Sequence, residues 1–333
     1  MAHETVLDVR DLTVEFPGAD GGWRPALRGV SLAVAAGERV ALVGESGSGK
    51  SVLALAALGL VSAPGRIAGG KVLVAGTDLS EATPERLRAL RGGAIGLVFQ
   101  EPAGAFNPVF TIGFQLAEAV RAHRRVGRAN ARAIARRLLE RTALDDSAGA
   151  WRSHPHQLSG GQLQRAMIAL ALAGDPGLLI ADEPTTALDL ETQARILDLL
   201  RGLAEEGRAL LLISHDLAVV AGLVDRVVVL FAGEVVEVAP AAELFARPLH
   251  PYTRWLLEVA RELGGDRPEA GPGSGGAPPA AGCRFAHRCE LVQPACRERR
   301  PALEPAGGAR TVRCPVAGDA ARAGRSLGGR GDG

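Results

Sequence analysis

A glycine-rich octapeptide, GESGSGKS at residues 44–51, lies between a short apolar strand and an apolar helix. This pattern is typical of a phosphate-binding loop, whose backbone N–H groups wrap the phosphates while the next helix adds its N-terminal dipole. We expect Lys50 to reach the β- and γ-phosphates and Ser51 to coordinate Mg²⁺. A glycine-rich turn without a ligand is the alternative. The predicted nucleotide contacts are Gly44, Glu45, Ser46, Gly47, Ser48, Gly49, Lys50, Ser51 and Val52.

Two adjacent carboxylates follow the apolar run Leu178–Ala181. In α/β sheets, ligands bind at the carboxyl ends of the strands, where Asp182 and Glu183 would lie. We expect Asp182 to help hold Mg²⁺ and Glu183 to polarise the attacking water. A solvated turn is the alternative interpretation, but it leaves the upstream phosphate loop without its acidic partner.

The surrounding elements are those that such a site needs. Short apolar runs alternate with helical segments, as buried parallel strands do, at residues 39–43, 95–99, 178–181, 210–214 and 227–231. Before them, residues 7–9 and 12–16 predict an opening strand pair, followed by a strand at 30–34. Residues 115–144 are helical and Arg-rich, and predict an inserted helical lobe. The fold class predicted is therefore α/β, a P-loop NTPase.

The bulk composition excludes some functions. The 38 basic residues are balanced by 37 acidic residues, giving a net charge of +1, whereas a nucleic-acid-binding protein usually carries a basic excess. The N-terminus lacks the basic and apolar regions of a secretory signal. The longest apolar runs are shorter than the roughly 18 residues of a membrane-spanning helix. We expect a soluble protein that needs a partner to act at a membrane.

The segment Leu158–Gln162, LSGGQ, resembles the signature of the ATP-binding cassette (ABC) family. The resemblance covers about residues 5–240. It implies a mixed-sheet core with an antiparallel β subdomain and an inserted helical lobe. It also implies roles for residues outside the phosphate loop: Phe16 stacks on adenine, Gln100 binds Mg²⁺ and acts in catalysis, His215 contacts the γ-phosphate, Asp189 belongs to the D-loop, and Ser159, Gly160, Gly161 and Gln162 contact the ATP of a partner subunit.

Further segments resemble the ATPases of oligopeptide and dipeptide importers. They are FQEP at 99–102, FNP at 106–108, HPHQ at 154–157, PLHPYT at 248–253 and the Cys-containing tail. Two departures occur: the loop after Gln100 reads Ala103-Gly104-Ala105, and Leu163 follows the signature where Arg is usual. Import of nickel complexes or glutathione stays open, and a soluble ABC ATPase without a transport role is the alternative of another class.

The resemblance implies an assembly at the cytoplasmic face of the cell membrane. Its partners would be a second ABC ATPase subunit (a paralogue, giving a heterodimer), two transmembrane permeases and an extracytoplasmic substrate-binding protein; no nucleic acid is expected. The permeases would contact the loop from Gln100 to Pro108. Substitution of Phe106 or Asn107 is then expected to uncouple transport from ATP hydrolysis.

Composition divides the chain into four parts. Residues 5–263 are the predicted cassette, with the helical lobe at about 101–160. Residues 264–282 are rich in Gly, Pro and Ala and predict a flexible linker. Residues 283–316 form a small Cys-rich, metal-binding extension, and residues 317–333 a disordered tail.

All four cysteines, Cys283, Cys289, Cys296 and Cys314, lie in this extension. Disulfides are unfavourable in a reducing compartment, and such a short segment has too little core to fold unaided, which favours a metal centre. Zinc usually shows a closely spaced Cys pair, which is missing here. The wider spacing and Pro315 favour a [4Fe–4S] cluster, which the resembling ATPases also carry. Zinc and free thiols stay open. ATP binding at a distant P-loop is expected to survive loss of the cluster.

Overall fold

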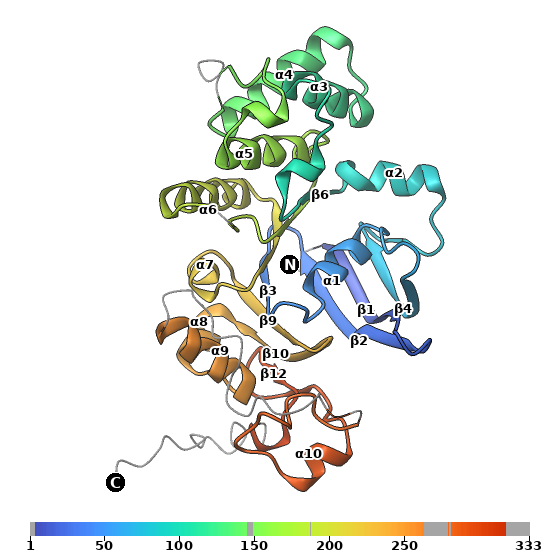
Figure 1. Cartoon of the computed structure of the whole chain (residues 1–333), viewed down its shortest axis with the longest axis vertical. Helices are drawn as coiled ribbons and strands as arrows, with labels where there is room; N and C mark the ends of the chain where they lie inside the picture. Colours follow the sequence, from blue (N-terminus) through green and yellow to red (C-terminus); the bar gives the residue numbers. More distant parts are fainter. Residues whose placement is uncertain (1–3, 145–148, 187, 263–278, 280, 318–333) are drawn as a thin grey trace.

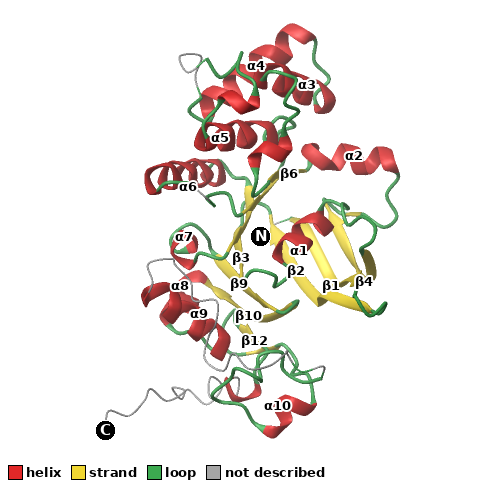
Figure 2. Cartoon of the chain, viewed as in Figure 1, coloured by secondary structure: helices red, strands yellow, loops and turns green. Residues whose placement is uncertain are grey.

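The computed structural model describes residues 4–144, 149–186, 188–262, 279 and 281–317 (Figure 1). Most of the predicted linker at 264–282, and all but the first residue of the tail predicted at 317–333, lie outside these residues. The described part contains two sheets, with helices around them and a separate group of helices at one end (Figure 2).

The larger sheet has eight strands in the order β11-β12-β10-β9-β3-β8-β7-β6. The five strands from β9 to β6 are parallel to their neighbours, whereas β10, β12 and β11 add antiparallel pairs. The parallel strands are buried almost throughout, which explains their continuous apolar sequences. The strands are β3 (Arg39–Val43), β6 (Ile95–Val98), β7 (Leu178–Asp182), β8 (Ala209–Ser214), β9 (Arg226–Phe231), β10 (Glu234–Pro240), β11 (Glu304–Pro305) and β12 (Thr311–Val312).

The smaller sheet is antiparallel and has the order β2-β1-β4-β5. Its strands are β1 (Thr5–Pro17), β2 (Trp23–Ala35), β4 (Arg66–Val74) and β5 (Thr77–Asp78). The predicted opening pair at 7–9 and 12–16 is wrong, because both segments belong to the single strand β1. Asp11 has a positive φ of 47°, and the pairing register shifts between Val9 and Leu12. This irregularity interrupts the alternation that the sequence prediction relied on.

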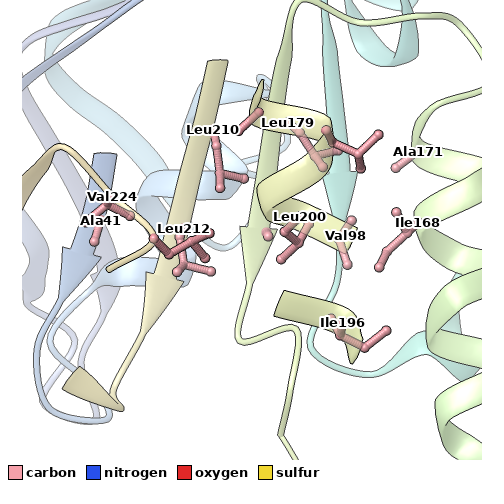
Figure 3. Packing of buried hydrophobic residues seen from close by; sticks show 14 of the residues in the cluster. Ala41, Val98, Ile168, Ala171, Leu179, Ile196, Leu200, Leu210, Leu212 and Val224 are labelled. Carbon is pink, nitrogen blue, oxygen red and sulfur yellow. The ribbon is translucent and has the colours of Figure 1, made fainter. Parts of the chain in front are cut away.

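The core of the larger sheet is formed by aliphatic side chains from strands and helices. In Figure 3, strand residues Leu179, Leu210 and Leu212 pack near helix residues Ile168, Ile196 and Leu200. All six are at most 2% exposed. Burial of each such side chain contributes on the order of 1.5–3 kcal/mol, so this packing fixes the strand ends that carry the polar groups described below.

The helical group follows β6 and comprises α3 (Ile112–His123), α4 (Arg128–Arg141) and α5 (Gly160–Ala171), with the short 3₁₀ helices η1 (Pro102–Ala105) and η3 (Pro155–Gln157). The helical lobe predicted at 115–144 contains two helices over this range, α3 and α4. Arg124 has extended backbone angles, and Gly127 is the N-cap of α4. Buried Leu116, Val120 and Leu138 explain the helical spacing of apolar residues.

The remaining helices are α1 (Lys50–Ala57), α2 (Pro84–Gly93), α6 (Leu190–Glu205), α7 (Leu217–Val220), α8 (Ala241–Ala246), α9 (Pro251–Glu262) and α10 (Pro294–Glu298). Within the described residues, none of the helices has the length and apolarity needed to cross a membrane. In Figure 1, the Cys-rich extension at 283–316, called the Cys-containing segment below (orange to red), lies beyond β10 and β12. It is at the opposite end of the molecule from α3 and α4.

Candidate functional site

The glycine-rich loop connects β3 to α1, as the sequence predicts. Gly49 is the N-cap of α1 and has a φ of 105°, a conformation that residues with a Cβ rarely adopt. A Cβ at Gly44 would lie 2.1 Å from the carbonyl oxygen of Leu230, so only glycine allows this approach. The Lys50 ammonium donates to the carbonyl oxygens of Gly44 and Glu45, each at 2.9 Å. The loop is therefore folded around the lysine.

An open cleft of about 460 Å³ lies in front of this loop. Groups that are far apart in the sequence converge on it: the loop, the end of β6, the end of β7 and the end of β8. Its lining comprises Ala26, Ser46, Gly47, Gly49, Lys50, Ser51, Val52, Gln100, Glu183, Thr186 and His215. Of the residues predicted to act in catalysis, Gln100, Glu183 and His215 all line this one cleft.

Glu183 follows β7 with a φ of 47°, which is unusual for a residue other than glycine. His215 Nδ1 lies 2.8 Å from Glu183 Oε2, and the Thr186 hydroxyl donates to the same oxygen at 3.1 Å. Burial raises the pKa of Glu183, but the hydrogen bond and charge of His215, together with Lys50, outweigh burial and lower that pKa overall. Glu183 is therefore a carboxylate at neutral pH, as a water-polarising group must be.

Asp182, at the end of β7, has the arrangement of a cation ligand. Its Oδ1 atom is buried, and among the described residues no hydrogen bond reaches it. Burial raises the pKa of this carboxyl group, and the hydrogen bond with Ser51 lowers it in part. A hard cation with oxygen ligands would satisfy the free oxygen. Ser51, Asp182 and the nearby amide of Gln100 therefore fit a Mg²⁺ ion.

The signature and D-loop residues lie at helix starts away from the cleft lining. Ser159 is the N-cap of α5: its hydroxyl accepts from the Gln162 N–H at 3.3 Å, and the Gln162 side chain accepts from the Ser159 N–H at 2.9 Å. Asp189 caps α6 by accepting from the Thr192 N–H at 2.9 Å. Neither Gly160 nor Gly161 lines the cleft. Among the described residues, those of the signature and the D-loop do not line the cleft, in keeping with a role across a subunit interface.

Two predicted nucleotide contacts have other surroundings. Phe16 is half-buried at the end of β1, and its ring covers Gly65, where a Cβ would be 2.5 Å away; it does not line the cleft. Glu45 does not line the cleft, and its carboxylate accepts two hydrogen bonds from Arg288. Of the remaining loop residues, Ser48 is buried, with a hydroxyl that has no partner among the described residues.

Comparison with known proteins places this site in a family. A family model described as ABC transporter matches residues 27–186, and one described as the oligopeptide/dipeptide transporter C-terminal region matches residues 236–296. The dipeptide transport ATP-binding protein DppD of Escherichia coli (strain K12) is 41% identical over 316 residues, which cover 93% of this chain and 96% of DppD. The oligopeptide transport ATP-binding protein AppD of Bacillus subtilis (strain 168) is 42% identical over 296 residues, covering 87% and 90%.

The chain belongs to the ATP-binding subunits of ABC transporters. The solved dimeric ATP-binding cassette MJ0796, in a post-hydrolysis state with ADP and Pi, superposes with a TM-score of 0.63 at 29% identity, covering 71% of this chain and 98% of that one. The predicted cassette fold and the predicted ATPase activity are thereby confirmed. As a transport ATPase, the chain works with permease subunits of its transporter.

The four cysteines of this ABC ATPase line a second, much smaller cavity of only about 10 Å³, whose other walls include His250, Phe285, Leu291 and Val316. Burial raises the pKa of both Cys283 and Cys314 to about 11. In the part of the chain that the structure describes, no three His, Cys, Asp or Glu side chains are arranged to hold one metal ion. The geometry thus gives no direct support for a metal centre, and the predicted cluster stays a prediction.

Several residues of the ABC ATPase site carry no motif that a sequence would reveal. Ala26 and Thr186 line the cleft, but neither belongs to a recognisable motif. Tyr252 accepts a hydrogen bond from the Glu45 N–H at 2.8 Å, and Arg288 binds the Glu45 carboxylate. The expectation that the P-loop is distant from the Cys-containing segment is therefore wrong. Charge complementarity alone does not select one arginine among so many, so the sequence carried no signal for this contact.

Proposed function

We propose that this chain hydrolyses ATP to drive import of di- or oligopeptides through membrane permeases. The observation that carries the proposal is the convergence of Lys50, Gln100, Glu183 and His215 on one cleft, in a chain 41% identical to a dipeptide transport ATPase over nearly its whole length. Nickel-complex or glutathione import and a role outside transport are not favoured by the relatives.

Each group at the cleft has a role in this reaction. Lys50 binds the β- and γ-phosphates, and His215 contacts the γ-phosphate. Glu183 orients and polarises the attacking water, a function supported by its ionised carboxylate in a buried position. Bound through Ser51, Gln100 and Asp182, Mg²⁺ supplies charge neutralisation for the phosphates. Phe16 would reach adenine only from outside the cleft lining, near the end of β1.

The active unit is a pair of cassettes. The N-terminus of α5, with Ser159, Gly160, Gly161 and Gln162, presents backbone N–H groups and a helix dipole, which suit the γ-phosphate of ATP held by a partner subunit. Asp189 at the start of α6 would lie near the same seam. We infer that the partner is a paralogous ATPase and that the pair sits at the cytoplasmic face of the membrane with two permeases and an extracytoplasmic binding protein.

Reconstitution in proteoliposomes tests this function. The chain is assembled with its partner ATPase, two permeases and a binding protein, and uptake of a labelled tripeptide is measured with ATP inside or outside. We expect peptide-dependent stimulation of ATP hydrolysis and uptake only when ATP reaches the cassettes. If the vesicles take up a nickel complex or glutathione in place of peptides, peptide import is rejected. If the chain does not assemble with permeases, the transport role is rejected.

We further propose that Cys283, Cys289, Cys296 and Cys314 hold a [4Fe–4S] cluster. All four cysteines line one cavity, and their spacing in the sequence lacks the close Cys pair that is usual for zinc. Because burial raises the pKa values of Cys283 and Cys314, cluster binding must release the protons of these thiols. The free energy of cluster binding must also offset the cost of burying thiolates. Anaerobically purified protein should be brown, with about four irons and four sulfides per chain. A colourless protein with one zinc would overturn the proposal.

A further inference from the structure

Arg288, in the Cys-containing segment, reaches the phosphate loop. Its two terminal nitrogens donate to the two carboxylate oxygens of Glu45, at 3.1 and 3.2 Å. The arginine side chain is 13% exposed and the glutamate side chain 26% exposed. Two parallel hydrogen bonds of this kind fix the orientation of both side chains and pair their charges. Because both side chains are largely buried, salt screens their attraction less than that of a surface ion pair.

Aromatic rings hold the Arg288 guanidinium in place. It lies 4.6 Å from the ring centre of Trp255, 5.5 Å from that of Phe285 and 5.9 Å from that of Phe231. These distances fit cation–π contacts. The rings come from α9, the Cys-containing segment and β9, so the guanidinium is positioned before any nucleotide binds. Its buried Nε has no hydrogen-bond partner among the described residues, so the charge depends on Glu45.

The same aromatic cluster contacts the backbone of the loop. The Tyr252 hydroxyl accepts the Glu45 N–H at 2.8 Å. Tyr252 is fully buried, with its ring centre 4.5 Å from that of Phe231 and 5.5 Å from that of Phe285. At its own N–H it donates to Nδ1 of His250, whose pKa burial lowers to about 3 and which is therefore neutral. Glu45 is thus held at both backbone and side chain.

This contact matters because of where Glu45 lies. Its carbonyl oxygen is one of two that accept from the Lys50 ammonium, so the position of Glu45 affects that of the lysine. Its carboxylate adds negative charge to a loop that must accept a polyphosphate. Without a partner, the Glu45 carboxylate would repel the phosphates of the nucleotide. Solvent would screen this repulsion only weakly, because the carboxylate is partly buried.

We propose that Arg288 and Tyr252 are positioning residues of the nucleotide site. Arg288 neutralises the Glu45 carboxylate and holds it away from the phosphates, and Tyr252 fixes the loop backbone that cradles Lys50. The Cys-containing segment therefore contributes to ATP affinity through a loop it does not itself form. The proposal rests on ATP binding at residues 44–51.

The two partners of the ion pair give opposite predictions. In the full-length chain, Arg288→Ala leaves the Glu45 charge unpaired, and the Kd for MgATP should rise about tenfold. Glu45→Gln removes that charge and leaves the positive Arg288 guanidinium beside the loop, so the Kd should fall. A contact that merely braced the loop would weaken binding in both variants. In the assembled ATPase, Arg288→Ala should raise KM for ATP and leave kcat within about twofold.

The double variant Glu45→Gln/Arg288→Ala should recover wild-type Kd within about twofold, because no unpaired charge remains. Arg297→Ala removes an exposed arginine of the same segment and is the matched control, with no change expected. If Arg288→Ala does not fold, the sign of the Glu45→Gln effect still decides. Unchanged or weaker binding by Glu45→Gln, or no effect of Arg288→Ala, would overturn the proposal, whereas a wild-type chain that binds no ATP would instead refute the nucleotide site.

Discussion

Glu183 shows how a single residue is prepared for its chemistry. It lies directly after a fully buried strand and has the uncommon φ of 47°, which costs on the order of 1–3 kcal/mol. Its carboxylate is held from one side by His215 and Thr186, with the Lys50 ammonium 4.0 Å away. The residue is therefore fixed in direction and in charge before the nucleotide arrives.

Replacing Glu183 by Gln keeps the size of the side chain and removes the negative charge. We expect turnover to fall by about 10²–10³-fold or more, since the water is no longer polarised, while ATP affinity stays nearly intact. The stalled ATP-bound form should accumulate as a dimer, measurable by light scattering. Glu85→Gln, at an exposed glutamate of α2, is the matched control and should hydrolyse ATP normally. Near-normal hydrolysis by Glu183→Gln would remove Glu183 from this role.

Turnover should also depend on pH through Glu183. Its pKa is held below the usual 4.5, so the carboxylate stays ionised at neutral pH and loses its charge only as the pH falls through that lowered value. The contribution of the Glu183 carboxylate to the free energy of unfolding is present above the pKa that this group has in the unfolded chain. That contribution is lost as the pH falls over the same acidic range. A pH–rate profile of kcat for the assembled ATPase, with an acidic limb above pH 5 assigned to Glu183, would contradict this.

At the residue scale, the sequence predicted groups that belong to contiguous motifs and missed those that depend on folding. The loop of Lys50 and the acidic pair at Asp182 are readable because their neighbours define a strand and a turn. Thr186 lies three residues beyond Glu183 and donates to it, but a threonine carries no motif. Tyr252 meets Glu45 across 207 residues, a contact that only the closed sheet brings about.

At the scale of elements, glycines in two helices have opposite surroundings. Gly202, near the end of α6, would meet nothing within 4 Å if it carried a Cβ. In α3, a Cβ at Gly113 would lie 2.3 Å from the ring of Trp151, which Arg136 covers from 4.6 Å. Gly202 therefore only lowers the helix propensity of α6, whereas Gly113 makes room for the ring of Trp151.

The same substitution should act in opposite directions at these two sites. Gly202→Ala should raise the free energy of unfolding by about 0.5–1 kcal/mol, because alanine loses less backbone entropy in a helix. Gly113→Ala should lower it by about 1–3 kcal/mol through overpacking against Trp151. Urea unfolding of the full-length chain measures both, and equal effects at the two glycines would contradict the packing described here.

The loop after β6 contains Phe106, whose substitution is expected from the sequence to uncouple transport from ATP hydrolysis. Phe106 is only 5% exposed and belongs to the main core, so its replacement should act first on folding. An apolar face is formed nearby by Val109, Phe110 and Phe114, which are 71%, 44% and 49% exposed; the two rings lie 4.9 Å apart. Hydrophobicity alone does not separate a buried Phe from an exposed one, so the sequence could not show that Phe106 is in the core; the permease contact of this loop stays a prediction.

Substitutions at the two kinds of phenylalanine should be distinguishable. Phe106→Ala should destabilise the chain by about 3–5 kcal/mol and reduce hydrolysis and transport in proportion. Phe110→Ser should leave the free energy of unfolding nearly unchanged while transport falls more than ATP hydrolysis in proteoliposomes. Proportional loss in the Phe110 variant would show that this face does not couple the ATPase to its permeases.

At the scale of the whole molecule, the C-terminal segment is attached through a buried carboxylate. Glu237 on β10 is fully buried, and its oxygens accept from the N–H groups of Leu249 and His250 at 2.9 and 2.8 Å. Arg310, which is 8% exposed, donates to the same carboxylate at 3.1 Å and to the carbonyl oxygen of Arg247 at 2.6 Å. A composition change after residue 263 suggested an appended piece, but these contacts join the segment to the sheet.

Arg310→Met should therefore destabilise the entire chain and not the C-terminal segment alone. The methionine fills a similar volume but leaves Glu237 buried without its counter-charge, and loss of one partner of a buried ion pair costs about 3–5 kcal/mol. Urea unfolding is followed by far-UV circular dichroism and, in a Trp23→Phe/Trp151→Phe background that leaves Trp255, by fluorescence. The two signals should shift together, because Glu237 lies on the larger sheet. Arg299→Met, at an exposed arginine of the same segment, should shift neither signal. A shift confined to the Trp255 signal would mean that the segment unfolds independently of the cassette.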